Sequence, residues 1–480
     1  MLKTIKNLVL YLISTIIVIA MFVLSYQVLS NTYINHEADY GESFHNLPEN
    51  SMDVLVLGSS HAQYSFSPNF FYQDTGLYSY VLGTGGQPLE MSYEMLKEGL
   101  KTQSPKLVIL EVYTALPLRD IAEADYNYIS PGYQMTGEEK INAFNYLPDE
   151  KGKEFLNEYL VNHNNWKTEG FSFDIITQAA HKTYLDLKGE KEYDYEKISD
   201  SFGYICNYLE LPPKNYWYPY NTHDYIDVEL DDLDKKSLDN ILNLCRNNDI
   251  ELVLYKTPMD SLDQENISYL HKVWEWADSN NVKYIDFVEE APKLGFYMWI
   301  HSDSFHSCIN GASIITSELS NLINNNYSFN HVENDMLREK YKKEGNRQIE
   351  DYLNYEYNAN FYLDRLKQYN GVVLIKYKKT ENCGEAIKNY LDYYHINTND
   401  DFIGLFKNGE LVKSDVEKIY VEIDGHIVLT SGDYFEVDGN GYEDTGDLVS
   451  VIISNDYSSF KVKSTNINRQ WQNSIDGYGC

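Results

Sequence analysis

The sequence predicts a doubly wound α/β domain on a parallel sheet, preceded by a transmembrane helix and followed by a β-rich domain. Three observations predict this order: an uncharged apolar run at residues 8–29, strand-like segments that alternate with helix-like ones between residues 51 and 325, and a change to short strands and tight turns after residue 326. A chain of 480 residues is long enough for two or three domains.

Residues 1–31 are expected to form a short cytosolic stub and a transmembrane helix, followed by a polar linker at residues 32–50. The run from Leu8 to Leu29 has no charged residue, and about 20 apolar residues cross the hydrocarbon core of a bilayer. Lysines precede the run and mostly acidic residues follow it, so the positive-inside rule places the bulk of the chain outside the cell membrane. A cleaved signal peptide is the alternative, although its apolar core usually has only about 7–15 residues.

Apolar runs without polar alternation indicate strands that are buried on both faces of a parallel sheet. Strands are expected at residues 53–57, 78–82, 107–112, 252–255 and 284–287, and helices at residues 89–100, 236–246, 269–277 and 311–323. Such alternation is typical of doubly wound α/β domains. Residues 114–230 interrupt it and are expected to form a helical insertion. If this insertion lies over the carboxyl ends of the strands, where ligands bind in open α/β folds, it would form a lid or an acceptor-binding wall.

The remainder of the chain is expected to contain a helical connector, residues 326–369, and a β-rich domain, residues 370–480. Its strand-like runs are residues 372–376, 402–406, 418–423, 427–429 and 449–453, and Asn-Gly and Asp-Gly turns separate some of them. No catalytic set of residues is recognisable in this region, so a binding or spacer module is expected.

The composition excludes several classes of function. The chain has 73 acidic and 39 basic residues, and such a surface repels a phosphate backbone, so a nucleic acid is not an expected partner. The five scattered cysteines contain no CxxC pair, which indicates neither a zinc site nor a disulfide framework. No phosphate loop or dinucleotide fingerprint is present. Neither a metal nor a cofactor is therefore expected.

Two distant stretches carry the residue types of a serine nucleophile and its base. Ser60 comes just after the first expected strand, and this would place it at the carboxyl edge of the sheet. His306 lies about 240 residues later, three residues after Asp303 and before the last expected helix. Imidazole is the usual base for a serine nucleophile, and a carboxylate can orient the imidazole ring. Either stretch alone is common in loops, whereas their combined order predicts a Ser60, His306 and Asp303 triad.

With this order of motifs, residues 51–325 resemble the SGNH/GDSL hydrolase superfamily, particularly its membrane-anchored envelope branch. Gly58-Ser59-Ser60 matches the first block of that family, the run from Gly83 to Gln87 looks like the second, and Asp303 with His306 matches the fifth. The resemblance implies a flavodoxin-like SGNH fold with Ser60 as the nucleophile. It also implies an oxyanion hole formed by the backbone N–H of Ser60 and that of Gly83 or Gly85.

The sequence departs from the family pattern at two places. Tyr113-Thr114-Ala115 follows the third expected strand where the third block would supply an asparagine to the oxyanion hole. Loss of one such donor costs roughly 10²–10³ in rate, and Gln87 is the candidate replacement. Cys308 stands where the resemblance predicts an asparagine two residues after His306, and its effect is expected on loop packing rather than on chemistry.

Further residues are expected near the site without a role in proton transfer. His61 adjoins the nucleophile and is expected to support it rather than to act as the base. Glu111 is equally compatible with a place near the site and with a buried structural role, and Lys256-Thr257-Pro258 is a smaller echo of the family. The other possible pocket residues are Trp299, His301, His163 and Trp166.

The resemblance implies acyl-group chemistry on a cell-envelope glycopolymer, such as a polysaccharide or a teichoic-acid-like polymer. Similar envelope proteins include polysaccharide O-acetylation factors and the D-alanine transfer protein of teichoic acid, so a membrane-bound O-acyltransferase is an expected partner. The missing third-block asparagine motivates an alternative, a non-catalytic polymer-binding or assembly factor. The β-rich region weakly resembles the interleukin-like EMT-inducer domain.

Overall fold

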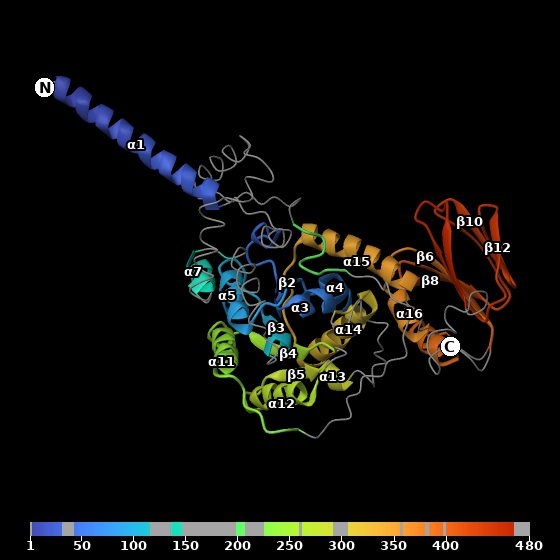
Figure 1. The fold of residues 1–480 in the computed structure, drawn as a ribbon. Helices are drawn as coiled ribbons and strands as arrows, with labels where there is room; N and C mark the ends of the chain where they lie inside the picture. The colour runs from blue at the N-terminus through green and yellow to red at the C-terminus, as the bar shows by residue number, and fades with distance from the viewer. Residues whose placement is uncertain are drawn as a thin grey trace.

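The structure is a computed structural model, and Figure 1 shows its fold. It describes residues 2–30, 43–115, 135, 137–145, 198–206, 225–258, 262–290, 306–355, 359–379, 384–396 and 400–464. Most of the predicted insertion at residues 114–230 therefore lies outside the described residues. The described part combines an α/β domain that contains a parallel sheet with a separate C-terminal region of antiparallel strands.

The N-terminal helix α1 (Leu2–Ser30) is a single element of 29 residues. Large apolar side chains along its middle, from Val9 to Met21, are exposed. Within the described residues, no helix has both the length and the apolar character that crossing a bilayer requires. The structure thus contains the predicted helix, and its role as a membrane anchor stays a prediction.

Five parallel strands form the central sheet of the α/β domain, in the order β2-β1-β3-β4-β5. They are β1 (Val54–Gly58), β2 (Ser79–Gly83), β3 (Leu107–Glu111), β4 (Glu251–Lys256) and β5 (Lys283–Asp286). Every residue of β1, β2 and β3 is buried, which agrees with their unalternated apolar sequences. β1 pairs with β2 on one side and β3 on the other. Its carboxyl end is therefore the topological switch point, where open α/β sheets bind ligands.

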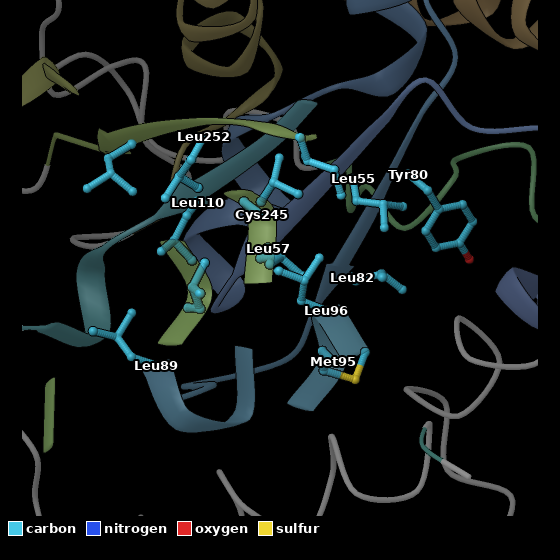
Figure 2. Close-up of a cluster of buried hydrophobic side chains, with 14 of the residues drawn as sticks. Leu55, Leu57, Tyr80, Leu82, Leu89, Met95, Leu96, Leu110, Cys245 and Leu252 are labelled. Carbon is cyan, nitrogen blue, oxygen red and sulfur yellow. The ribbon is translucent and has the colours of Figure 1, made fainter. Parts of the chain in front are cut away.

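Helices cover both faces of this sheet. They are α3 (Ser60–Ser65), α4 (Pro68–Thr75), α5 (Leu89–Gly99), α7 (Gly137–Asn145), α11 (Asp232–Asn247), α12 (Gln264–Ser279), α13 (Phe287–Glu290) and α14 (Ile309–Asn326), with a 3₁₀ turn η1 (Tyr113–Ala115) after β3. Leu55 and Leu57 join the core that includes α5 and α11, shown in Figure 2. Val54 and Val56 join the opposite core, which includes α14. This division follows from the alternation of side chains along a strand.

Capping residues explain why two helices begin earlier than the apolar periodicity predicted. The Asp231 side chain accepts a hydrogen bond from the Leu233 N–H at the start of α11, and the Asp263 side chain accepts one from the Asn266 N–H at the start of α12. An aspartate at this position satisfies a backbone donor that has no partner within the helix. The polar first turns of both helices were therefore marked in the sequence by their caps.

The C-terminal region contains two antiparallel sheets, and its order confirms the predicted β-rich character. The sheets have the orders β14-β13-β6-β7-β8 and β12-β11-β10-β9. Their strands are β6 (Val372–Tyr377), β7 (Phe402–Lys407), β8 (Glu410–Asp415), β9 (Lys418–Ile423), β10 (His426–Ser431), β11 (Tyr434–Val437), β12 (Asn440–Glu443), β13 (Leu448–Ile453) and β14 (Phe460–Ser464). All five predicted strand positions in this region are occupied by strands.

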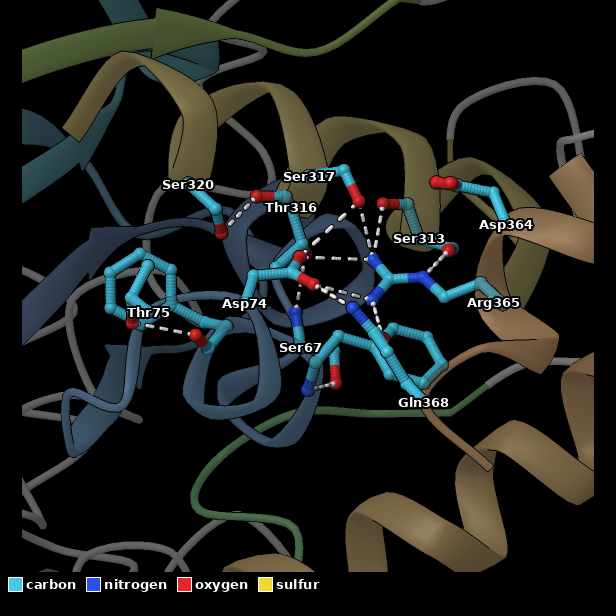
Figure 3. Close-up of polar contacts among 12 residues, drawn as sticks. Ser67, Asp74, Thr75, Ser313, Thr316, Ser317, Ser320, Asp364, Arg365 and Gln368 are labelled. Atoms are coloured by element: carbon cyan, nitrogen blue, oxygen red, sulfur yellow. Dashed lines mark hydrogen bonds and ion pairs between the residues drawn. The ribbon is translucent and has the colours of Figure 1, made fainter. Parts of the chain in front are cut away.

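Helices α15 (Asp335–Tyr355) and α16 (Ala359–Leu366) connect the two regions, and α17 (Gly384–Tyr393) lies between β6 and β7. α15 packs on α4, and α16 contacts α15 and α17. Arg365 on α16 reaches Asp74 on α4 and Ser313 on α14, as Figure 3 shows. The connector helix α16 is therefore bonded to two helices of the α/β domain, α4 and α14.

Candidate active site

Ser60 is the first residue of α3 and lies two residues after Gly58, the last residue of β1. Ser59 caps the helix, because its side chain accepts a hydrogen bond from the His61 N–H at 3.2 Å. Gly58 has a φ of 146°, and a Cβ atom there would lie 2.9 Å from the Cβ atom of Glu111. Glycine thus permits a tight strand-to-helix turn beside β3. The turn holds Ser60 at the switch point of the sheet.

His306 meets Ser60 across 246 residues of sequence. Its Nε2 atom lies 2.8 Å from the Ser60 Oγ atom. His306 stands three residues before α14, which packs on α3 and α4. A serine hydroxyl within hydrogen-bond distance of an imidazole nitrogen is the geometry of a nucleophile and its general base. The structure therefore brings together the two residues whose meeting the motif order predicted.

The remaining predicted partners of this pair fall on residues that the structure does not describe. Asp303, Trp299, His301, His163 and Trp166 all lie outside the described residues. Their predicted places in the triad and the pocket stay predictions. Cys308 is described, and it is a buried residue at the N-terminal boundary of α14.

The loop after β2 lies against the nucleophile turn. Gly83 pairs with Gly58 in the parallel register of β1 and β2, and a Cβ atom on Gly83 would lie 2.8 Å from the Gly58 carbonyl oxygen. Gly85 follows in a turn that the hydrogen bond from the Gln87 N–H to the Thr84 carbonyl oxygen closes at 3.1 Å. Ser60, Gly83 and Gly85, whose N–H groups were predicted to form the oxyanion hole, thus lie at the carboxyl ends of two neighbouring strands, β1 and β2.

The Gln87 side chain differs from its predicted role as an oxyanion donor. Its Nε2 atom donates to the Leu82 carbonyl oxygen at 3.3 Å and to the Ser92 hydroxyl at 3.0 Å. Its Oε1 atom accepts from the Thr84 hydroxyl at 3.3 Å. Both amide hydrogens therefore hold the turn between β2 and α5, and neither remains for a substrate oxygen.

A buried ion pair lies at the carboxyl ends of β3 and β4. Glu111 was predicted either near the site or in a buried structural role, whereas its pairing with Lys256 was not predicted. The Lys256 Nζ atom is 3.8 Å from the Glu111 Oε1 atom, and neither side chain has any exposed surface. Thr257 links this pair to the site, because its hydroxyl lies 3.2 Å from Glu111 Oε1 and 2.7 Å from His61 Nδ1. The available signal was a charged residue at the carboxyl end of each of these two strands.

The His61 ring connects this ion pair to the catalytic candidates. It stacks on the Tyr113 ring with centroids 3.8 Å apart, and its centroid is 5.3 Å from that of His306. Tyr64 contacts the His306 ring as well, with centroids 4.6 Å apart. The imidazole of His306 therefore packs against two side chains that come from the helix of the nucleophile.

Burial and charge act in opposite directions on the ionisable groups at this edge of the sheet. Burial raises the pKa of the Glu111 carboxyl, and the Lys256 charge and the N–H groups of Tyr113 and Thr257 oppose that rise. Burial lowers the pKa of the Lys256 amine, which Glu111 and Asp286 oppose. Burial and the charge of Glu289 raise the pKa of Asp286, at the end of β5, to about 6. Three buried ionisable groups thus lie at this edge of the sheet, and neighbouring charges and hydrogen bonds offset only part of the effect of burial on their pKa values.

Asp286 predicts a pH dependence of stability. Its pKa in the folded chain, about 6, exceeds the ordinary value of 3.8, so between these values the folded state binds more protons than the unfolded state. The contribution of Asp286 to stability is therefore largest below about pH 4 and is lost as the pH rises to about 6. Asp286→Asn is expected to flatten this part of the profile, measured as the unfolding temperature between pH 4 and 7. The exposed control Asp278→Asn should retain the wild-type slope, and equal slopes in all three proteins would contradict the assignment.

Comparisons with known proteins give weak likenesses. No protein-family model and no curated protein matches the sequence. Solved structures with similarity include a putative acylhydrolase from Bacteroides fragilis NCTC 9343, with 12% identity over 60% of this chain and 94% of that chain and a TM-score of 0.29. A GDSL-like lipase from Bacteroides thetaiotaomicron VPI-5482 has 10% identity over 62% and 100% of the two chains and a TM-score of 0.31. A gut microbial diltiazem-metabolizing enzyme has 12% identity over 56% and 47% and a TM-score of 0.24.

Proposed function

We propose that this chain is a serine esterase or O-acyltransferase of the SGNH/GDSL type, in which Ser60 is the nucleophile, His306 the general base and Asp303 the group that orients His306. The observation that carries the proposal is the 2.8 Å distance between Ser60 Oγ and His306 Nε2. This contact lies at the switch point of a doubly wound sheet, the place where ligands bind in such folds.

The reaction would proceed through an acyl-enzyme. Ser60 Oγ attacks the carbonyl carbon of an ester while His306 Nε2 takes the hydroxyl proton. The resulting imidazolium then gives this proton to the leaving alkoxide, and the acyl group stays on Ser60. Water or a sugar hydroxyl attacks the acyl-enzyme next, His306 accepts its proton, and that proton returns to Ser60 Oγ when the product leaves. Hydrolysis and transfer differ only in this second nucleophile.

The oxyanion of each tetrahedral intermediate would be bound by backbone donors. Ser60 is the first residue of α3, so its N–H has no acceptor within the helix. Gly83 ends the neighbouring strand β2 and Gly85 follows it, and one of these two glycines supplies the second donor in this proposal. Such donors stabilise the negative charge that develops in the transition state.

A cell-envelope glycopolymer is the proposed substrate, and the cell membrane is the proposed location, with one span and the bulk of the chain outside. The uncharged run at residues 8–29 and its flanking charges support this placement. An enzyme tethered there meets mainly lipids, wall polymers and membrane proteins. A membrane-bound O-acyltransferase is a proposed partner that would supply or receive acyl groups.

Covalent labelling tests the proposed nucleophile. A fluorophosphonate probe is expected to modify the full-length chain once, at Ser60, because the probe traps a serine that a neighbouring base activates. Peptide mass analysis would locate the label. Ser60→Ala should abolish the labelling, whereas the exposed Ser104→Ala should label like the wild type. A folded wild-type chain that carries no label, or a label at another serine, would reject Ser60 as the nucleophile.

A non-catalytic polymer-binding or assembly factor is the second candidate. The observation that favours it is the backbone N–H of Tyr113, which donates to Glu111 Oε2 at 3.0 Å in the region where the third block would supply an oxyanion donor. A scaffold of this kind should keep its function in the cell envelope after Ser60→Ala. An enzyme should lose it, and the acyl content of the wall polymers measured by mass analysis should change.

A further inference from the structure

The hydrogen bonds around the Glu111 carboxylate all point toward it. Its Oε1 atom faces the Thr257 N–H at 3.3 Å and the Thr257 hydroxyl at 3.2 Å, and its Oε2 atom accepts from the Tyr113 N–H. The Lys256 ammonium, 3.8 Å from Oε1, can also only donate. Both oxygens of this carboxylate thus already accept a hydrogen from a backbone N–H group. The hydrogen of the Thr257 hydroxyl is therefore directed to Glu111.

The hydrogen-bonding groups that the Thr257 hydroxyl still has free determine which ring nitrogen of His61 carries a hydrogen. A hydroxyl has one hydrogen and two lone pairs. The hydrogen is directed to Glu111, and one lone pair faces the Lys256 Nζ atom at 3.2 Å. His61 Nδ1 lies 2.7 Å from the same oxygen. Because only a lone pair is left for this contact, the shared hydrogen must belong to His61 Nδ1.

The same carboxylate also fixes the position of the ring that stacks on His61. The hydrogen bond from the Tyr113 N–H to Glu111 Oε2 fixes the backbone of Tyr113. The Tyr113 ring is nearly parallel to the His61 ring, at an interplanar angle of 13°. The Lys256 Nζ atom lies 5.3 Å from the centroid of the Tyr113 ring. His61 is thus held through its Nδ1 atom and through its ring face by groups that converge on one buried ion pair.

We propose that Thr257 and Glu111 are positioning residues of the site, an inference that rests on the esterase function proposed above. They place a hydrogen on His61 Nδ1 and fix the orientation of its ring. The His61 ring in turn holds the imidazole of His306 in line with Ser60. A buried ion pair brings little net stability compared with apolar residues of the same volume, so its place beside His61 favours a role in geometry.

Nuclear magnetic resonance of the imidazole nitrogens tests the hydrogen position directly. The full-length chain would be labelled with ¹⁵N at histidine, and the spectrum of His61→Gln would identify the His61 signals. The wild type is expected to show a protonated Nδ1 in His61. Thr257→Val should lose this fixed state because it removes the acceptor, and Thr257→Ser should restore it. An unprotonated Nδ1 in the wild type would overturn the proposal.

A second pair of variants isolates Glu111. In Glu111→Leu, the Thr257 hydroxyl loses its acceptor and is expected to donate to His61 Nδ1, which would move the ring hydrogen to Nε2. If this variant does not fold because Lys256 is left unpaired, Glu111→Leu combined with Lys256→Met removes both charges. The double variant then tests whether the loss of Glu111 moves the ring hydrogen of His61. A His61 ring that keeps its hydrogen on Nδ1 in the folded variant would exclude Glu111 from this role.

The kinetic consequence is measured as the rate of fluorophosphonate labelling at Ser60. Thr257→Val should slow it about 10- to 100-fold, since small displacements of a base cost that much, and Thr257→Ser should recover most of the loss. The hydrogen position is read without any substrate, so the two proposals fail separately. A chain that never labels but has the predicted Nδ1 state refutes only the esterase function. A chain that labels equally fast in Thr257→Val refutes only the positioning role.

Discussion

Ser60→Ala is expected to lower the turnover of p-nitrophenyl acetate by about 10³- to 10⁶-fold. Alanine has no oxygen to form the acyl-enzyme, so the remaining rate would come from substrate binding and from the backbone donors alone. The distance of 2.8 Å to His306 Nε2 identifies the hydroxyl that the variant removes. The measurement is the steady-state rate of nitrophenol release by the full-length chain, compared with the uncatalysed rate.

The size of the loss in related variants separates a catalytic pair from two independent residues. His306→Gln should cost about as much as Ser60→Ala, and the double variant should cost little more than either, because the two groups act as one unit. Ser104→Ala, an exposed serine outside the site, should retain the wild-type rate. Turnover within about tenfold of the wild type in a folded Ser60→Ala chain would refute nucleophilic catalysis by this residue.

Much of the α/β domain could be predicted because its information is local. β1 and β3 are buried on both faces, and their unbroken apolar runs record that burial. The meeting of Ser60 and His306 was also predictable, although 246 residues separate them. A residue after the first strand and a residue before the last helix converge at the same edge of such a sheet. The order of the motifs along the chain was therefore enough to predict that Ser60 and His306 lie together.

The ion pair beneath the site could not be predicted in the same way. Glu111 ends β3 and Lys256 ends β4, and their contact depends on the register in which these two strands pair. The sequence shows only that each strand ends in a charged residue. Gln87 is the reverse case, because a role was predicted for its side chain that the structure does not show. Its amide could equally have faced a substrate, and only the positions of Leu82 and Ser92 show that the turn uses both hydrogens.

The ion pair that joins the connector to the α/β domain could likewise not be predicted from the sequence. Arg365 and Asp74 are 291 residues apart, and each stands in an ordinary helical pattern. Burial reveals the difference, because the Arg365 side chain is only 3% exposed. An arginine is seldom buried to this extent unless its guanidinium is fully paired.

Arg365→Ala is expected to destabilise the chain by about 3–5 kcal/mol, the usual cost of leaving one partner of a buried ion pair alone. The guanidinium donates to both carboxylate oxygens of Asp74, at 2.9 and 3.2 Å, and to the side chains of Ser313, Ser317 and Gln368 (Figure 3). It also lies 4.5 Å from the centroid of the Phe70 ring. Alanine removes these contacts and leaves a carboxylate that is 12% exposed.

Chemical or thermal unfolding measures this loss, and Arg347→Ala provides the matched control. Arg347 pairs with Glu344 and Asp351 on its own helix, with its side chain 51% exposed, so its loss should cost less than about 1 kcal/mol. Arg365→Met combined with Asp74→Asn should recover part of the stability, since no charge is then left unpaired. Arg365→Lys should recover little, because one ammonium group cannot replace a planar fork.

The position of this ion pair gives its loss a second consequence. Asp74 lies on α4, which follows the helix of Ser60, and Ser313 lies on α14, which follows His306. Arg365 therefore ties together the two helices next to the candidate nucleophile and base. Arg365→Ala should consequently slow the labelling of Ser60 at temperatures where the chain is still folded. A variant that is destabilised by less than Arg347→Ala would show that the Arg365 ion pair does not hold these helices together.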